Sequence, residues 1–64
     1  MRSLPLAVKI ADHVAAAKAG RIPLDVQAKA ERLSNDHPEA RASRAEIAET
    51  LREEGAALGL ELAN

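Results

Sequence analysis

The segment from Ser43 to Leu58 constrains the fold most, because it carries a full set of signals for one amphipathic helix. Ser43 followed three residues later by Glu46 is a capping box, in which each side chain satisfies a backbone N–H at the helix start. Gly59 can take the left-handed conformation that ends a helix, with Leu60 placed to fold back on it. Apolar residues recur at helical spacing along one side of this segment: Ile47, Ala48, Leu51, Gly55 and Leu58.

A first helix is predicted at about residues 4–19. Ser3 can cap it, Gly20 is expected to end it, and Pro23 prevents its continuation. Lys18 is suited to the negative end of the helix dipole. The apolar face is made by Ala7, Ile10, Ala11 and Val14 and widened by Val8, Ala15 and Ala17, with Lys9, Asp12, His13 and Ala16 opposite.

A second helix is predicted at roughly residues 24–34, with either Ile22 or Asp25 at its cap. Its apolar stripe is narrow and consists of Val26, Ala30 and Leu33, with Leu24 and Ala28 on another side. Turn residues follow, and Asp36 with Glu39 could cap a short turn over 38–42. The last five residues alternate apolar and polar, so they either form an edge strand or pack Leu60 and Leu62 onto the helices.

The sequence predicts a single all-α domain over residues 1–64, made of three helices and a short extended C-terminal tail. Its apolar fraction is 47%, but fifteen of these residues are alanine and none is aromatic. A chain with so small a core is expected to gain stability from a second chain. The expected core is Ile10, Val14, Val26, Leu33, Ile47, Leu51 and Leu58, and Leu4, Leu6, Ile22, Leu60 and Leu62 are assigned to either core or interface.

Composition excludes several functional classes. There is no cysteine, which rules out disulfides, thiolate metal sites and thiol chemistry. No stretch approaches 18 apolar residues, so a membrane helix is excluded and a soluble cytoplasmic protein is expected. The net charge of −1 gives no overall attraction for nucleic acid. We expect no cofactor.

The sequence contains no catalytic or metal-binding pattern. His13 and His37 are the only side chains with an ordinary pKa near neutrality, and no other ligand stands at zinc-binding spacing from them. Ser34, Asp36 and His37 are too close in sequence to form a hydrolytic triad, whose members come from separate elements. We therefore expect neither enzyme activity nor a metal site.

Gly55 is the most informative glycine. Within a helix, glycine costs about 1 kcal/mol relative to alanine, and Gly55 lies on the apolar side of the main helix. Either another backbone approaches closely there, as in contact with a second subunit, or the helix ends early at this residue. The candidate partner interface consists of Val8, Ala11, Ala15, Gly55, Leu60 and Leu62.

A basic patch is the basis of a second hypothesis. Its candidate residues are Lys29, Arg32, Arg41 and Arg44, which would suit phosphates if they converge. Residues 43–51 resemble in part the first helix of a helix-turn-helix, but the segment that follows is acidic and lacks a basic recognition helix.

The leading hypothesis is a small non-catalytic module that binds another protein or a second copy of itself, as an adaptor, inhibitor, antitoxin-like regulator or minor subunit. The alternative is a dimeric DNA-binding regulator that uses the four cationic residues. An accessory subunit that completes the active site of a larger enzyme is the third.

Overall fold

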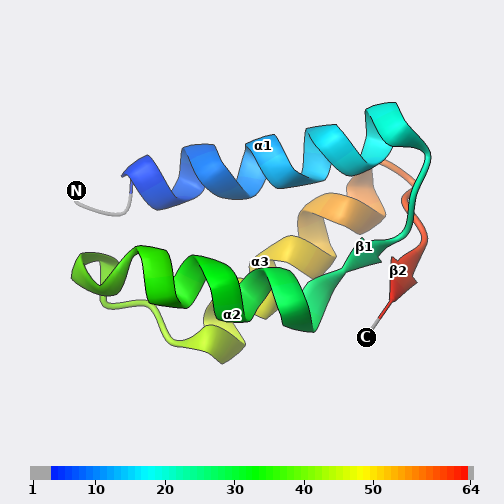
Figure 1. The fold of residues 1–64 in the computed structure, drawn as a ribbon. Helices are drawn as coiled ribbons and strands as arrows, with labels where there is room; N and C mark the ends of the chain where they lie inside the picture. Colours follow the sequence, from blue (N-terminus) through cyan, green and yellow to red (C-terminus); the bar gives the residue numbers. More distant parts are fainter. Residues whose placement is uncertain (1–3, 64) are drawn as a thin grey trace.

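A computed structural model describes residues 4–63 and confirms a small, mostly α-helical domain with three helices. Helices α1 and α2 run antiparallel, α3 packs behind them, and two short strands lie at the end of the molecule where α1 finishes (Figure 1). The most extensive helix contact is between α2 and α3. In chain order the elements are α1 (Leu4–Gly20), β1 (Leu24–Asp25), α2 (Val26–Asp36), the 3-10 helix η1 (Pro38–Ala40), α3 (Arg44–Ala57) and β2 (Leu62–Ala63). The predicted cap Ser3 and the side chain of Leu4 lie outside the described residues.

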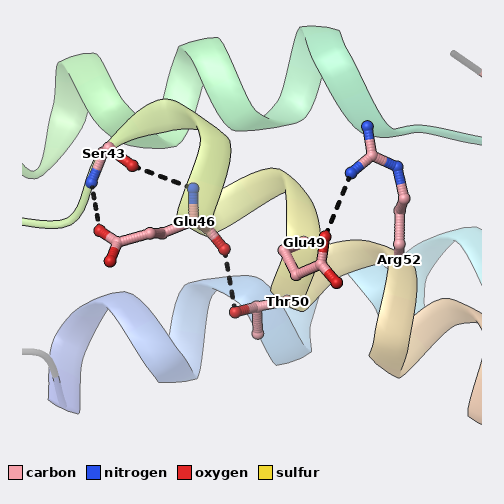
Figure 2. Close-up of polar contacts among 5 residues, drawn as sticks. All are labelled: Ser43, Glu46, Glu49, Thr50 and Arg52. Atoms are coloured by element: carbon pink, nitrogen blue, oxygen red, sulfur yellow. Dashed lines mark hydrogen bonds and ion pairs between the residues drawn. The ribbon is translucent and has the colours of Figure 1, made fainter.

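The capping box and the glycine turn predicted for α3 both form, and the helix ends at Ala57, one residue before the predicted Leu58. The Glu46 N–H donates to the Ser43 hydroxyl over 3.1 Å, and the Ser43 N–H donates to the Glu46 carboxylate over 2.9 Å (Figure 2). At the other end Gly59 has φ +74°, and the Leu60 N–H donates to the Gly55 carbonyl over 2.9 Å. This pattern satisfies carbonyls at the end of the helix and turns the chain back toward the core.

The end of α1 differs from the prediction by one residue. Gly20 is the last helical residue, and Arg21 takes the left-handed conformation, with φ 55°. The Ile22 N–H donates to the Ala17 carbonyl over 3.2 Å, which closes the helix in the same way as at Gly59. The prediction that Gly20 ends the helix was therefore wrong by one residue, because Arg21 is the residue that takes the left-handed conformation.

Exchanging the roles of these two residues is expected to stabilise the domain. A glycine within a helix costs about 1 kcal/mol relative to alanine, and a left-handed non-glycine residue costs about the same. A Cβ on Gly20 would meet only the Ile22 side chain, at 3.8 Å. We expect Gly20→Ala with Arg21→Gly to raise the free energy of unfolding by about 1–2 kcal/mol, measured by urea denaturation. The account of this turn is wrong if neither single substitution adds stability.

Helix α2 begins and ends two residues later than predicted. Asp25 is its N-cap, and the carboxylate of Asp25 accepts the Ala28 N–H over 3.1 Å. This selects Asp25 over Ile22 as the cap. The preceding Leu24 belongs to β1 rather than to the helix, and its side chain is buried. After α2, η1 forms within the predicted turn, but its cap position is His37, which makes no side-chain capping bond, and Asp36 remains in α2.

The C-terminal tail forms a parallel strand pair with β1. Leu24 is opposite Leu62 and Asp25 is opposite Ala63, and the Leu24 N–H donates to the Glu61 carbonyl over 2.9 Å. Leu60 and Leu62 are also half-buried against the core. Both alternatives predicted for the tail are therefore present, because it pairs as a strand with β1 and also packs Leu60 and Leu62 against the core.

The core lies between the three helices and the strand pair. Six of the seven predicted core residues are buried, and the exception is Leu58, which is 45% exposed. Leu58 follows the last turn of α3, where its neighbours on α1 are Ala11 and Ala15, whose short side chains leave it uncovered. Ile22 is also exposed, whereas Leu6 joins the core. The buried core among the described residues is Leu6, Ile10, Val14, Ala17, Leu24, Val26, Ala30, Leu33, Ile47, Ala48 and Leu51.

Candidate functional site

Helix α1 has a second apolar side that the core does not use. Its buried side is formed by Leu6, Ile10, Val14 and Ala17. Val8, Ala11 and Ala15 share another side of the helix because they recur at spacings of three and four residues. All three are exposed, Val8 by 50%. The broad apolar face that the sequence predicted is thus divided between the core and the surface.

Leu58 extends this apolar surface onto α3. A groove of about 280 Å³ runs between the two helices and is lined by Ala11, Val14, Ala15, Glu54, Ala57 and Leu58. The Lys18 ammonium donates to the Leu58 carbonyl over 3.0 Å, so Lys18 neutralises the end of α3 rather than only that of its own helix. We refer to Val8, Ala11, Ala15 and Leu58 as the α1 outer face.

The other three predicted interface residues face inward. Gly55 lies in the interior of α3 and is buried, so it does not end the helix. A Cβ built on Gly55 would lie 2.8 Å from the Leu62 Cδ2 and 3.1 Å from the Leu24 Cδ2. Side-chain methyl groups of the same chain, rather than the backbone that was predicted, therefore approach Gly55 closely. Leu60 and Leu62 are half-buried against the core and take part in this intramolecular packing.

The four predicted nucleic-acid contacts come from α2, from the residue after η1 and from the start of α3. Lys29 and Arg32 lie on α2 near His13 of α1. Arg41 lines a groove of about 390 Å³ between α1, η1 and α3. Arg44 lies beside Gln27 in a different groove, between α2 and α3.

A different basic cluster forms where α1 meets α2. Partial burial lowers the pKa of His13 below its ordinary value of 6.5. Three cationic neighbours lower this pKa further, and one carboxylate opposes them: Lys29, Arg32, Lys9 and, in the opposite direction, Asp12. We call Lys9, His13, Lys29 and Arg32 the basic seam. Sequence reasoning missed Lys9 and His13 as part of a basic surface, although their i, i+4 spacing on one helix was a usable signal.

Acidic side chains gather on the outward side of α3. Glu46, Glu49 and Glu53 are exposed there, while the opposite side of the helix is buried in the core. Glu46 serves the capping box, and the Glu49 carboxylate lies 3.7 Å from the Arg52 guanidinium (Figure 2). We call these three glutamates the acidic ridge.

The two histidines lie on different parts of the fold, His13 within α1 and His37 between α2 and η1. The His37 Nδ1 lies 3.3 Å from the Glu39 carboxylate, and both groups belong to the turn around η1. Between residues 4 and 63, no three His, Asp or Glu side chains are grouped so that they could hold a metal ion. The same part of the chain contains no helix with the length and apolar character needed to cross a membrane. Comparison of the chain with known protein families, curated proteins and solved structures found no match.

Proposed function

We propose that this protein is a non-catalytic binding module that packs its α1 outer face against a helix of another polypeptide. The observation that supports the proposal is that α1 has two apolar sides, and only one of them is covered by the chain itself. Isolated exposed apolar residues are ordinary on a protein surface, whereas contiguous apolar patches larger than a few hundred Å² are typical of interaction sites. A cytoplasmic location is part of the same proposal.

The residue types on the α1 outer face suit a helical partner. Ala11 and Ala15 are small, so a second helix axis can approach to the lower end of the usual 8–10 Å range. Val8 and Leu58 stand on either side of them and can insert between the side chains of that helix. Covering the exposed halves of Val8 and Leu58 contributes only about 2–3 kcal/mol. Micromolar affinity requires about 8 kcal/mol, so the partner must also cover surface beyond these four residues.

Two neighbouring alanines provide a matched test. Ala15 lies on the α1 outer face, whereas Ala16 is exposed on another side of the same helix. Glutamate at either position has nearly the same effect on helix propensity, but only Ala15→Glu places a charge in the interface. We expect Ala15→Glu to abolish the complex and Ala16→Glu to retain it, with equal helicity by circular dichroism.

Light scattering after size exclusion, at two protein concentrations, determines first whether the partner is a second copy. A wild-type dimer that Ala15→Glu dissociates and Ala16→Glu retains identifies the partner as this chain. If the wild type is a monomer, the same two variants are tested for copurification with a different protein. Equal binding by the two variants in either setting contradicts the proposal.

The DNA-binding alternative has less support, because the net charge is −1 and Arg41 and Arg44 line two different grooves. It predicts retention on duplex DNA at low salt that weakens steeply as salt is added. The accessory-subunit hypothesis shares the α1 outer face with our proposal and differs only in what the partner does.

A further inference from the structure

We infer that the partner of the α1 outer face is a second copy of this chain, whose α1 lies antiparallel to the first across a two-fold axis between Ala11 and Ala15. This inference rests on the proposed function, because it uses the same face, and it adds the identity and the orientation of the partner. Two observations carry it, namely the order of large and small residues along the face and the positions of Lys18 and Glu54 beside it.

Helices α1 and α3 pack against each other and run in the same direction, which fixes the level of each residue along the face (Figure 1). A groove near the start of α1 joins Leu6 to Ile47, and a second groove further along joins Ala15 to Leu58. Glu54 lines both grooves, so it stands beside the middle of α1. The Lys18 ammonium, which donates to the Leu58 carbonyl over 3.0 Å, marks the far end of the face.

The α1 outer face is complementary to itself in the order of its side-chain sizes. An interface between two copies related by a two-fold axis requires this, because the same patch of surface is used on both sides. The small Ala11 and Ala15 form the centre of the face, and a larger apolar side chain stands toward each end, with Val8 before Ala11 and Leu58 beside Ala15. An antiparallel copy therefore packs alanines on alanines at the centre, and brings the Val8 end of one chain to the Leu58 end of the other.

The charges beside the face are also complementary to themselves. Lys18 lies about 10 Å beyond Ala11 along α1, whereas Glu54 lies near the level of Ala11, and both border the face on the side of α3. In an antiparallel pair of helices the like sides meet and the order of levels is reversed, so each Lys18 comes within reach of Glu54 of the other copy. Both side chains are exposed, and among residues 4–63 neither has an opposite charge within 4.0 Å in its own chain.

A parallel arrangement of two copies lacks this pairing of charges. It places each Lys18 at the same end of the interface as Lys18 of the other copy, and each Glu54 at the level of the other Glu54, and like charges across an interface are unfavourable. Asp12 is exposed on the edge of α1 away from α3 and lines neither groove, so water solvates its carboxylate. The charge pattern therefore selects the antiparallel dimer.

The test is sedimentation equilibrium of the full chain at low ionic strength, over about a hundredfold range of protein concentration. We expect a monomer–dimer equilibrium whose Kd rises at least about fivefold in Lys18→Glu and in Glu54→Lys, because either reversal makes both symmetry-related pairs repulsive. Lys9→Glu and Glu53→Lys are the matched controls. They make the same charge changes on the same two helices, at exposed residues that line neither groove, and we expect them to dimerise as the wild type does.

Mixing the two reversed variants distinguishes a lost charge pair from a loss of folding. Two Lys18→Glu chains oppose four carboxylates, and two Glu54→Lys chains oppose four ammonium groups, but one chain of each kind restores two pairs of opposite charge. We expect the mixture to form a heterodimer about as tight as the wild-type dimer, detected by native mass spectrometry. A variant that is merely unfolded is not rescued by mixing.

Three results would overturn the inference: a wild type that is monomeric at every concentration, a dimer whose Kd neither reversal changes, or a mixture of the reversed variants that stays monomeric. None of these contradicts the proposed function, because a different protein can still cover the α1 outer face. The proposed function fails on a separate result, which is equal binding by Ala15→Glu and Ala16→Glu.

Discussion

Replacing Leu51 by alanine is expected to leave most of the chain unfolded at 25 °C. Leu51 is fully buried in the middle of α3, where that helix faces the core. Truncation of a buried leucine to alanine costs about 2–5 kcal/mol, and a domain of this size rarely has more than about 3–5 kcal/mol of stability in total. Far-UV circular dichroism of the variant should show loss of most of the helical signal.

Leu58→Ala is the matched control for this result. It is the same substitution on the same stretch of chain, but Leu58 is 45% exposed. We expect a cost below about 1 kcal/mol, because less area is removed from contact and no closed cavity remains. A larger loss in Leu58→Ala than in Leu51→Ala would contradict the assignment of the core. Both residues were predicted to be buried, so this comparison also tests the correction at Leu58.

The second large effect is expected at Gly55. A valine at this position would place its Cβ within 3.1 Å of both the Leu24 and the Leu62 methyl groups, and would then add two further carbons. Leu24 is fully buried and cannot move freely, whereas Leu62 is half-buried at the edge. We expect Gly55→Val to cost about 1–3 kcal/mol through overpacking and to detach β2 from β1. Loss of amide-exchange protection at the Leu24 N–H, which donates to Glu61, measures this detachment.

Gly55→Ala distinguishes overpacking from a general sensitivity of the helix. Alanine gains about 1 kcal/mol in helix propensity, and its Cβ requires mainly that the Leu62 methyl group rotate away. We expect the two effects to nearly cancel, so that Gly55→Ala is close to neutral. If Gly55→Val also leaves the free energy of unfolding unchanged and the Leu24 N–H keeps its protection from amide exchange, the strand pair does not pack on α3 as described.

Features that depend on neighbouring residues were predictable from the sequence. The capping box of Ser43 and Glu46 and the turn at Gly59 involve groups within a few residues of one another, and both form as expected. Gly20 was predicted to end α1, whereas Gly20 is still helical and Arg21 is the left-handed residue, because the sequence indicates where a helix stops only to within a residue or two.

Features that depend on distant parts of the chain were not predictable. The strand at Leu24–Asp25 exists because the C-terminal tail returns to pair with it, and two residues alone carry no strand pattern. The basic seam depends on which sides of α1 and α2 face each other. Periodicity assigned Ala11 and Val14 to one apolar face, but only the packing of α3 decides that Val14 is buried and Ala11 exposed.

The most direct test of the proposed function is site-specific photo-crosslinking in cells, with a benzophenone amino acid at position 11, 15 or 16 in otherwise native chains. The α1 outer face predicts a light-dependent adduct from positions 11 and 15 and none from position 16, and the mass of the adduct tells whether the partner is a second copy. No adduct from positions 11 and 15, or equal adducts from all three positions, would contradict the proposal.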